Sequence, residues 1–252
     1  MRIGILQCDR VRSTLSADYG EYPQMIIEAF NTAAASEQSF TFNTYAAYEG
    51  VLPDSIKDCD AYLLTGSRFS VFDHGKPWIN PLRDFVVRLN KARIKTIGIC
   101  FGHQLMAEAM GGKVERADCG WQIGQHKATV ITHKDYMRPK TEYLNLAMMC
   151  EDQINELPEK AEIIATMPHC QYAFLQYGEH FISTQAHPEF SQAFAKMLIN
   201  VRKEEFPSKR LARGLTSFNQ SEHDGLLLFQ WFTHFLTADL ANKTDSVSST
   251  DE

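Results

Sequence analysis

The sequence lacks the patterns that would place it in several large classes of protein. Its 252 residues include six cysteines but no CxxC pair, so neither a zinc site nor a disulfide framework is expected. No apolar run approaches the roughly 20 residues of a membrane span, and the charged start MRIGILQCDR does not resemble a signal peptide. A GxxxxGKS/T phosphate loop and a GxGxxG dinucleotide fingerprint are also absent. We therefore expect a protein of the reducing cytoplasm.

The charge of the chain gives no indication of a nucleic-acid or membrane partner. It carries 25 Lys and Arg against 31 Asp and Glu, a formal net charge of −6 at pH 7. No basic stripe is present, so we expect no binding to nucleic acid or to anionic membranes. The hydrophobic share of 44% and the charged share of 22% are those of an ordinary globular protein.

The first part of the chain alternates short apolar runs with amphipathic segments. The apolar runs predict strands at 2–8, 40–45, 60–65 and 95–99. The amphipathic patterns predict helices at 23–35 and 78–91, the second with one apolar face made of Ile79, Leu82, Phe85, Val86 and Leu89. This alternation predicts an α/β fold with a mostly parallel sheet flanked by helices and a site at the carboxyl ends of its strands.

The second part predicts a smaller antiparallel portion and two further helices. Closely spaced strand-like runs lie at 127–132, 162–167, 172–176 and 181–185. Helices are expected at 191–203 and 224–240, with apolar stripes facing the core: Phe194, Met197, Leu198 and Val201 in the first, and Leu228, Trp231, Phe232, Phe235 and Leu236 in the second. The charged segment 202–213 reads as a solvated face.

These patterns fit one domain over residues 1–240. Within it we expect a core that extends to about residue 206 and a C-terminal helical extension at 207–240. Residues 241–252 are rich in Ser, Thr and Asp, so we expect a disordered tail there.

One cysteine lies where a predicted strand meets a predicted helix. Cys100 is the centre of Gly98-Ile99-Cys100-Phe101-Gly102, and the helix-forming segment that follows ends at two glycines, 111 and 112. This is the spacing of a nucleophile elbow, in which the flanking glycines let neighbouring backbone pass closely. The first amides of such a helix stabilise a thiolate and can hold an oxyanion. Taken alone, the pentapeptide fits a buried structural cysteine equally well.

A second segment supplies the groups that cysteine catalysis requires. Residues 181–190 read FISTQAHPEF, a strand that runs into His187, Pro188 and Glu189. A nucleophilic cysteine needs a base within hydrogen-bond reach and a third group that fixes the tautomer of that base. A lone His-Pro-Glu segment is typical of a surface turn. Because this segment follows a second strand end, it favours a catalytic set instead. The order along the chain is then nucleophile, base and orienting group.

Together, GICFGHQLMAEAMGG and QAHPEF resemble the class I glutamine amidotransferase family of the triad type, and the resemblance extends to about residue 190. It implies a flavodoxin-like fold. It also implies Cys100 as the nucleophile, His187 as the general base and acid, and Glu189 as the orienting group. Gly66 and Phe101 correspond to the residues whose backbone amides form the oxyanion hole, although Thr65-Gly66-Ser67 stands where many relatives have a Pro-Gly-Gly type of loop.

The resemblance implies two substrate-binding residues. Gln104 matches a residue that helps to bind glutamine in the family. Cys150 departs from the His-x-Asp segment that many relatives have at this place, so only Asp152 is assigned to the substrate there. Loop 68–78 follows the Gly66 turn directly, and we expect it to wall the space beyond the substrate carbonyl.

The implied activity is release of ammonia from the side-chain amide of glutamine through a cysteine γ-glutamyl thioester, without a metal or organic cofactor. The layout resembles free-standing relatives of the amidotransferase domain of GMP synthase, so a synthase subunit that accepts ammonia is one expected partner. Two alternatives stay open. One is a γ-glutamyl peptidase acting on glutathione-like compounds, and the other is a non-catalytic or partner-activated module with the same fold.

Overall fold

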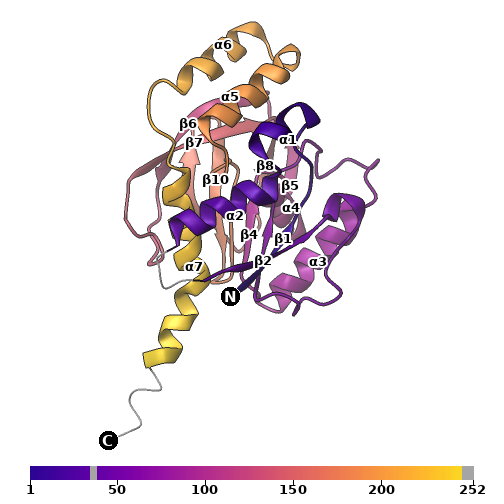
Figure 1. The fold of residues 1–252 in the computed structure, drawn as a ribbon, viewed down its shortest axis with the longest axis vertical. Helices are drawn as coiled ribbons and strands as arrows, with labels where there is room; N and C mark the ends of the chain where they lie inside the picture. Colours follow the sequence, from indigo (N-terminus) through magenta and orange to yellow (C-terminus); the bar gives the residue numbers. More distant parts are fainter. Residues whose placement is uncertain (35–38, 246–252) are drawn as a thin grey trace, which may run out of the picture.

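A nine-stranded sheet runs through the middle of the protein, with helices packed on both of its faces (Figure 1). The computed structural model describes residues 1–34 and 39–245. The strand order is β2-β1-β3-β4-β11-β10-β9-β6-β7. The first five strands in this order pair in parallel and the rest are antiparallel, so the predicted α/β fold with a parallel part and an antiparallel part is confirmed.

The parallel part follows the predicted runs closely, but it also takes in the run at 181–185 that was expected in the antiparallel portion, because this strand pairs in parallel with β4 on one side and antiparallel with β10 on the other. Its strands are β1 (Arg2–Leu6), β2 (Thr41–Tyr45), β3 (Ala61–Leu64), β4 (Thr96–Ile99) and β11 (Phe181–Thr184). Every residue of β3, β4 and β11 is buried, because helices cover both faces of the sheet at these strands. Their carboxyl ends lie at one edge of the sheet.

Four helices cover the parallel strands. Helices α2 (Tyr22–Ala33) and α7 (Gly225–Asp245) lie on one face, alongside each other in Figure 1, and α3 (Ile79–Lys91) and α4 (Phe101–Ala109) lie on the other. The predicted apolar face of α3 is buried in full, and so is that of α7. Trp231 and Phe232 of α7 are completely inaccessible to solvent. The expected C-terminal extension therefore supplies part of the main core.

The antiparallel part contains several strands that the sequence did not predict. It comprises β6 (Gln122–Val130), β7 (Tyr143–Cys150), β9 (Ala161–Met167) and β10 (Cys170–Tyr177), and a separate pair joins β5 (Lys113–Arg116) to β8 (Asp152–Glu156). Strands β5, β7 and β8 are the unpredicted ones. Strand β7 reads YLNLAMMC, and its Leu, Ala and Met favour a helix by local propensity. Its pairing along β6 overrides that preference.

The remaining helices pack at the end of the sheet that carries β6 and β7. These are α1 (Ser13–Tyr19), α5 (Gln192–Val201) and α6 (Ser208–Ser217), with a short 3₁₀ turn, η2 (Lys203–Glu205), between the last two. A second 3₁₀ turn, η1 (Ala47–Glu49), follows β2 at the opposite edge of the sheet. Ser191 caps α5 by accepting a hydrogen bond from the backbone of Phe194. Phe194 and Leu198 are buried as predicted, but Met197 and Val201 are exposed, so that stripe was wrong in half of its members.

The predictions for segment 202–213 and for the end of the helix at 224–240 were both wrong in part. Segment 202–213 is not simply a solvated face, because it contains most of α6 and its first side chain, Arg202, is only 12% exposed. Helix α7 continues to Asp245, past the expected boundary at 240. The rest of the predicted tail, 246–252, lies outside the described residues, and the single-domain division stays a prediction.

Gly98 lets strand β4 and helix α4 approach each other closely. A Cβ there would lie 2.8 Å from the backbone carbonyl atoms of Gly102. We expect Gly98→Ala to lower the free energy of unfolding by about 1–3 kcal/mol, because backbone cannot move aside as a side chain can. Gly75→Ala is the matched control, since its nearest atom is a carboxylate oxygen of Asp73 at 3.2 Å in an exposed loop. Equal losses in urea denaturation would contradict this reading of the turn.

Candidate active site

Cys100 lies in the sharp turn between β4 and α4 that the sequence predicted. Its φ is 50° and its ψ is −100°, a strained conformation for a residue with a side chain. Two backbone hydrogen bonds hold the turn: Cys100 N–H donates to Thr184 O at 2.8 Å, and Gln104 N–H donates to Cys100 O at 3.0 Å. The side chain is almost fully buried, at 4% exposure of the residue. Strain at such a position is typical of functional sites.

His187 and Glu189 lie in the loop that follows β11, and both are buried. His187 Nδ1 is 2.8 Å from Glu189 Oε1. Phe190 stacks on the imidazole with 4.1 Å between the ring centroids and 10° between the planes. The backbone N–H of His187 donates to Ala147 O on β7 at 2.8 Å. The position and the tilt of this imidazole are therefore fixed by one carboxylate, one aromatic ring and one strand.

The electrostatic environment favours the protonated form of His187. Burial lowers the pKa of this histidine, but the negative charges of Glu189 and Cys100, together with hydrogen bonds to both side chains, raise the pKa to about 10. The structure thus brings the three residues of the predicted triad together. Their arrangement suits an imidazolium held between a thiolate and a carboxylate.

The two expected oxyanion residues lie beside Cys100. Gly66 follows β3, and a Cβ there would lie 2.7 Å from His187 Cε1 and 3.6 Å from Cys100 Cβ. Only glycine lets this loop lie against both residues. Phe101 is the first residue of α4, where backbone N–H groups have no partner within the helix. Their use as oxyanion donors stays a prediction.

Gln104 and Asp152, the two expected substrate contacts, are also neighbours in the structure. The Gln104 side-chain amide donates to the backbone carbonyl of Asp152 at 2.7 Å. The carboxylate of Asp152 accepts a hydrogen bond from Ser70 and pairs with Arg116 Nε at 3.0 Å. Protein groups therefore already engage the Asp152 carboxylate, and its contact with substrate stays a prediction.

Gln185 is a site residue that the sequence analysis quoted but did not assign. Its side-chain amide donates to Cys100 Sγ at 3.5 Å, and its carbonyl oxygen accepts from Gln104 Nε2 at 3.0 Å. The residue is completely buried. A polar side chain directly after a buried strand and two residues before the histidine was the available signal. Gln185 links the expected substrate residue to the nucleophile.

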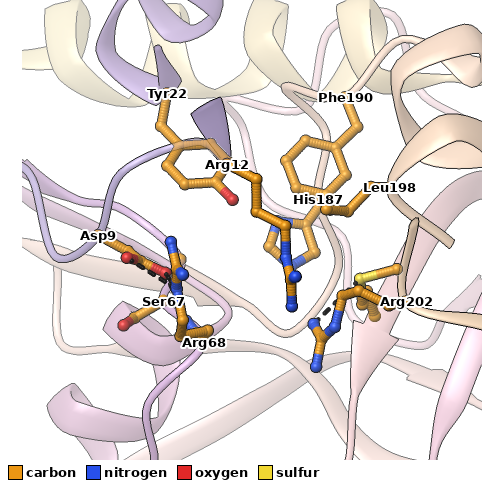
Figure 2. Close-up of a pocket in the computed structure, with 11 residues that line it drawn as sticks. Asp9, Arg12, Tyr22, Ser67, Arg68, His187, Phe190, Leu198 and Arg202 are labelled. Atoms are coloured by element: carbon orange, nitrogen blue, oxygen red, sulfur yellow. Dashed lines mark hydrogen bonds and ion pairs between the residues drawn. The ribbon is translucent and has the colours of Figure 1, made fainter. Parts of the chain in front are cut away.

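A small pocket of about 30 Å³, open to solvent, lies beside His187 (Figure 2). Its wall includes three arginines, Arg12, Arg68 and Arg202, with Asp9. The apolar part of the wall is made by Tyr22, Met149, Phe190 and Leu198. Loop 68–78 was expected to form the wall beyond the substrate carbonyl, but it contributes only Arg68 here. The rest of the wall comes from the loop after β1, the start of α2, the turn after β3, strand β7, the loop after β11 and the region around α5.

Two absences concern only the part of the chain that the structure describes. No group of three or more His, Cys, Asp or Glu in residues 1–34 and 39–245 is placed to hold a metal ion. Within the same residues, no helix has both the length and the apolar character needed to cross a membrane.

Comparison with known families agrees with this fold. The profile of the family described as "Glutamine amidotransferase class-I" matches residues 19–200. The chain therefore belongs to the class I glutamine amidotransferase family. The matched span contains Cys100, His187 and Glu189.

Individual relatives are distant and carry two kinds of name. Gamma-glutamyl peptidase 3 of Arabidopsis thaliana is 27% identical over 184 residues, which cover 69% of this chain and 71% of the relative. A putative glutamine amidotransferase-like protein of Schizosaccharomyces pombe is 25% identical over 208 residues, covering 79% and 83%. A glutamine amidotransferase from Thermotoga maritima has a crystal structure with a TM-score of 0.72 at 18% identity, covering 94% of this chain and 97% of that one. This last likeness shows a shared fold.

We expect Cys100 to be the cysteine that a glutamine-like diazo-ketone alkylates fastest, as measured by peptide mass spectrometry. Other buried thiols nearby are poor competitors, because burial raises the pKa of Cys170 to about 12 and raises the pKa of Cys150 well above its usual range. Cys170→Ala is the control and should label like the wild type. Equal labelling of Cys100→Ala protein would contradict the assignment.

Proposed function

We propose that the protein is a cysteine amide hydrolase that cleaves the γ-amide of a glutamyl group, with glutamine as the simplest substrate. The observation that carries the proposal is the strained Cys100 beside a His187 that is hydrogen-bonded to Glu189. Membership in the class I glutamine amidotransferase family supports it. The chemistry uses only side chains and backbone amides.

In the first step, the Cys100 thiolate attacks the γ-carbonyl carbon and a tetrahedral intermediate forms. Backbone amides of Gly66 and Phe101 hold its oxyanion. Before the attack, the hydrogen bond from Gln185 stabilises the thiolate and keeps Sγ in place. Gln104 and Asp152 lie on the same side of Gln185 and would contact the glutamyl end of the substrate.

In the second step, His187 gives its proton to the departing amine as the carbon–nitrogen bond breaks. A γ-glutamyl thioester on Cys100 remains. Water then attacks the thioester carbonyl, His187 accepts a proton from that water, and the thiolate leaves. The products are glutamate and one amine, which is ammonia when the substrate is glutamine. We place any acceptor of this ammonia on a partner synthase subunit.

A γ-glutamyl peptide is the second candidate substrate. It presents the same γ-carbonyl to Cys100 and differs from glutamine only in the leaving amine. The pocket beside His187 is open to solvent, so it does not confine a longer leaving amine. The name of the Arabidopsis relative, Gamma-glutamyl peptidase 3, supports this candidate as well.

We expect His187→Ala to reduce kcat by about 10³-fold or more, because both proton transfers pass through this imidazole. Steady-state assays with glutamine and with a γ-glutamyl dipeptide measure the effect, and circular dichroism checks the fold. His133→Ala is a matched control, since that histidine lies at the protein surface with its Nε2 3.8 Å from Glu142 Oε1. A folded His187→Ala protein with near-normal turnover would rule out the proposed role.

We expect Glu189→Gln to move the alkaline limb of the kcat/KM profile to lower pH. The Glu189 charge raises the pKa of His187, so its removal lowers that pKa toward the ordinary value. The alkaline limb marks the pH range in which His187 loses the proton that the leaving amine needs. Because the pKa of His187 is raised to about 10, we expect this limb near pH 10 in the wild type and shifted down by roughly one unit or more in the variant. An unmoved limb would show that Glu189 does not set the proton affinity of His187.

A further inference from the structure

We propose that His223 is a positioning residue of the active site, whose Nε2–H group donates a hydrogen bond, directly or through one water molecule, to the second carboxylate oxygen of Glu189. The inference rests on the proposed cleavage at Cys100 and adds a residue to that same site. Three features carry it: the place of His223 against the turn that carries the triad histidine, the tautomer of its imidazole, and a donor and an acceptor that both lack a partner.

His223 lies against the turn between the triad histidine and the triad carboxylate. A Cβ at Gly225 would lie 2.1 Å from Pro188 O and 2.5 Å from His223 Cε1, so the imidazole and the backbone of the turn meet at this glycine. The next residue fixes the segment: Asp224 N–H donates to Asn145 O at 2.9 Å, and Asp224 Oδ2 accepts from Asn145 Nδ2 at 3.0 Å. The same strand, β7, also accepts the backbone N–H of the triad histidine.

The imidazole of His223 is held in one tautomer. Gly225 N–H donates to its Nδ1 at 3.3 Å, so Nδ1 is an acceptor. Burial lowers the pKa of His223, although the charges of Glu189 and Asp224 act in the opposite direction, so the neutral ring predominates near pH 7. A neutral imidazole with an accepting Nδ1 carries its proton on Nε2.

This Nε2–H group is a donor without an acceptor. The residue as a whole is partly exposed, but His223 Nε2 is buried and forms no hydrogen bond with any described residue. Glu189 Oε2 is likewise buried, with no donor among the described residues. Nearly all buried polar atoms in proteins are paired, and the charge of Glu189 acts directly on the pKa of His223. The donor and the acceptor therefore satisfy each other.

Two other groups compete less well for this contact. The carbonyl of His187 also acts on the pKa of the second imidazole, but it already accepts the backbone N–H of Phe190 at 3.5 Å. Burial raises the pKa of Tyr22 most, followed by the charge of Asp9 and then that of Glu189, so Asp9 is the stronger neighbour of that hydroxyl. A carboxylate is also a stronger acceptor than a carbonyl, because it is charged.

The second hydrogen bond fixes the orientation of the Glu189 carboxylate. Glu189 Oε1 is 2.8 Å from His187 Nδ1, but the terminal torsion of a glutamate is broad, so this contact alone leaves the carboxylate free to turn. A donor on Oε2 holds Oε1 toward the imidazole and thereby holds the imidazole toward Cys100. His223 therefore acts through Glu189 and does not touch the substrate.

Proton–nitrogen correlation NMR of the histidine rings in the full chain tests the contact independently of turnover. In the wild type, we expect a slowly exchanging His223 Nε2–H resonance, which Glu189→Ala should move upfield because the acceptor is lost. His180, whose Nε2 is 2.8 Å from Asn90 Oδ1 just before β11, is the internal reference. A His223 resonance that Glu189→Ala leaves unchanged would overturn the inference.

Substitution of His223 separates positioning from folding. We expect His223→Phe, which keeps an aromatic ring without a donor, to lower kcat about tenfold with little change in KM. His223→Gln should recover most of this loss, because the Nε2 of glutamine can still donate. In Glu189→Ala protein, His223→Phe should change kcat by less than roughly twofold, because its target is gone. His180→Phe removes another buried histidine and, as the matched control, should keep kcat within roughly twofold of the wild type.

The kinetic outcomes that overturn the inference differ from those that overturn the proposed function. Equal losses in His223→Phe and His223→Gln would show that only packing matters. A loss that persists undiminished in Glu189→Ala protein would show that His223 acts elsewhere, and near-normal kcat in His223→Phe would remove the role altogether. Hydrolysis of neither glutamine nor a γ-glutamyl dipeptide by the wild type would overturn the proposed function, and the NMR comparison would still decide the contact.

Discussion

The parallel pairing of β4 with β11 is the contact on which the candidate site depends. Ile99 is in register with Thr184, and the next N–H, that of Cys100, donates to the Thr184 carbonyl. This one pairing brings two distant parts of the chain to a common strand end. Gln185 and His187 follow immediately on the β11 side, while the first turn of α4 follows on the β4 side. The residues of the predicted triad are therefore positioned by a ladder of backbone hydrogen bonds.

Local patterns were sufficient for the elements that carry their own signal. Strands β1 and β4 each consist of a short β-branched run, and α3 has an apolar stripe within 13 residues. The type of each element and its buried face were therefore predicted correctly. Strand β7 could not be predicted in this way. Its Leu, Ala and Met residues favour a helix, and only its neighbour β6 determines its conformation. The short helix α1 was missed because a seven-residue segment gives too few turns for a periodic pattern.

The candidate site likewise combines residues that local sequence predicts with residues that it does not. Cys100, His187 and Glu189 belong to two compact motifs, and the structure brings them together. The arginines of the pocket belong to no motif. Arg202 stands in a charged stretch that looks solvated in sequence, and its actual surroundings are Trp121 from the segment before β6, Met149 from β7 and Glu205 from a 3₁₀ turn. A pocket wall assembled from residues so far apart along the chain has no signature in local sequence.

The position of α7 has a consequence for the order in which the protein can acquire its structure. Phe229 of this helix packs edge-on against Phe30 of α2, with 5.0 Å between the ring centroids, and Trp231 is fully enclosed. The face of the sheet that α2 covers is thus completed by a segment that is synthesised after all the strands of the described part of the chain. On the ribosome, the growing chain holds an open apolar surface beside β1 and β3 until α7 has emerged. Chaperone occupancy on nascent chains should therefore last until this final helix docks, well after the triad residues have left the exit tunnel.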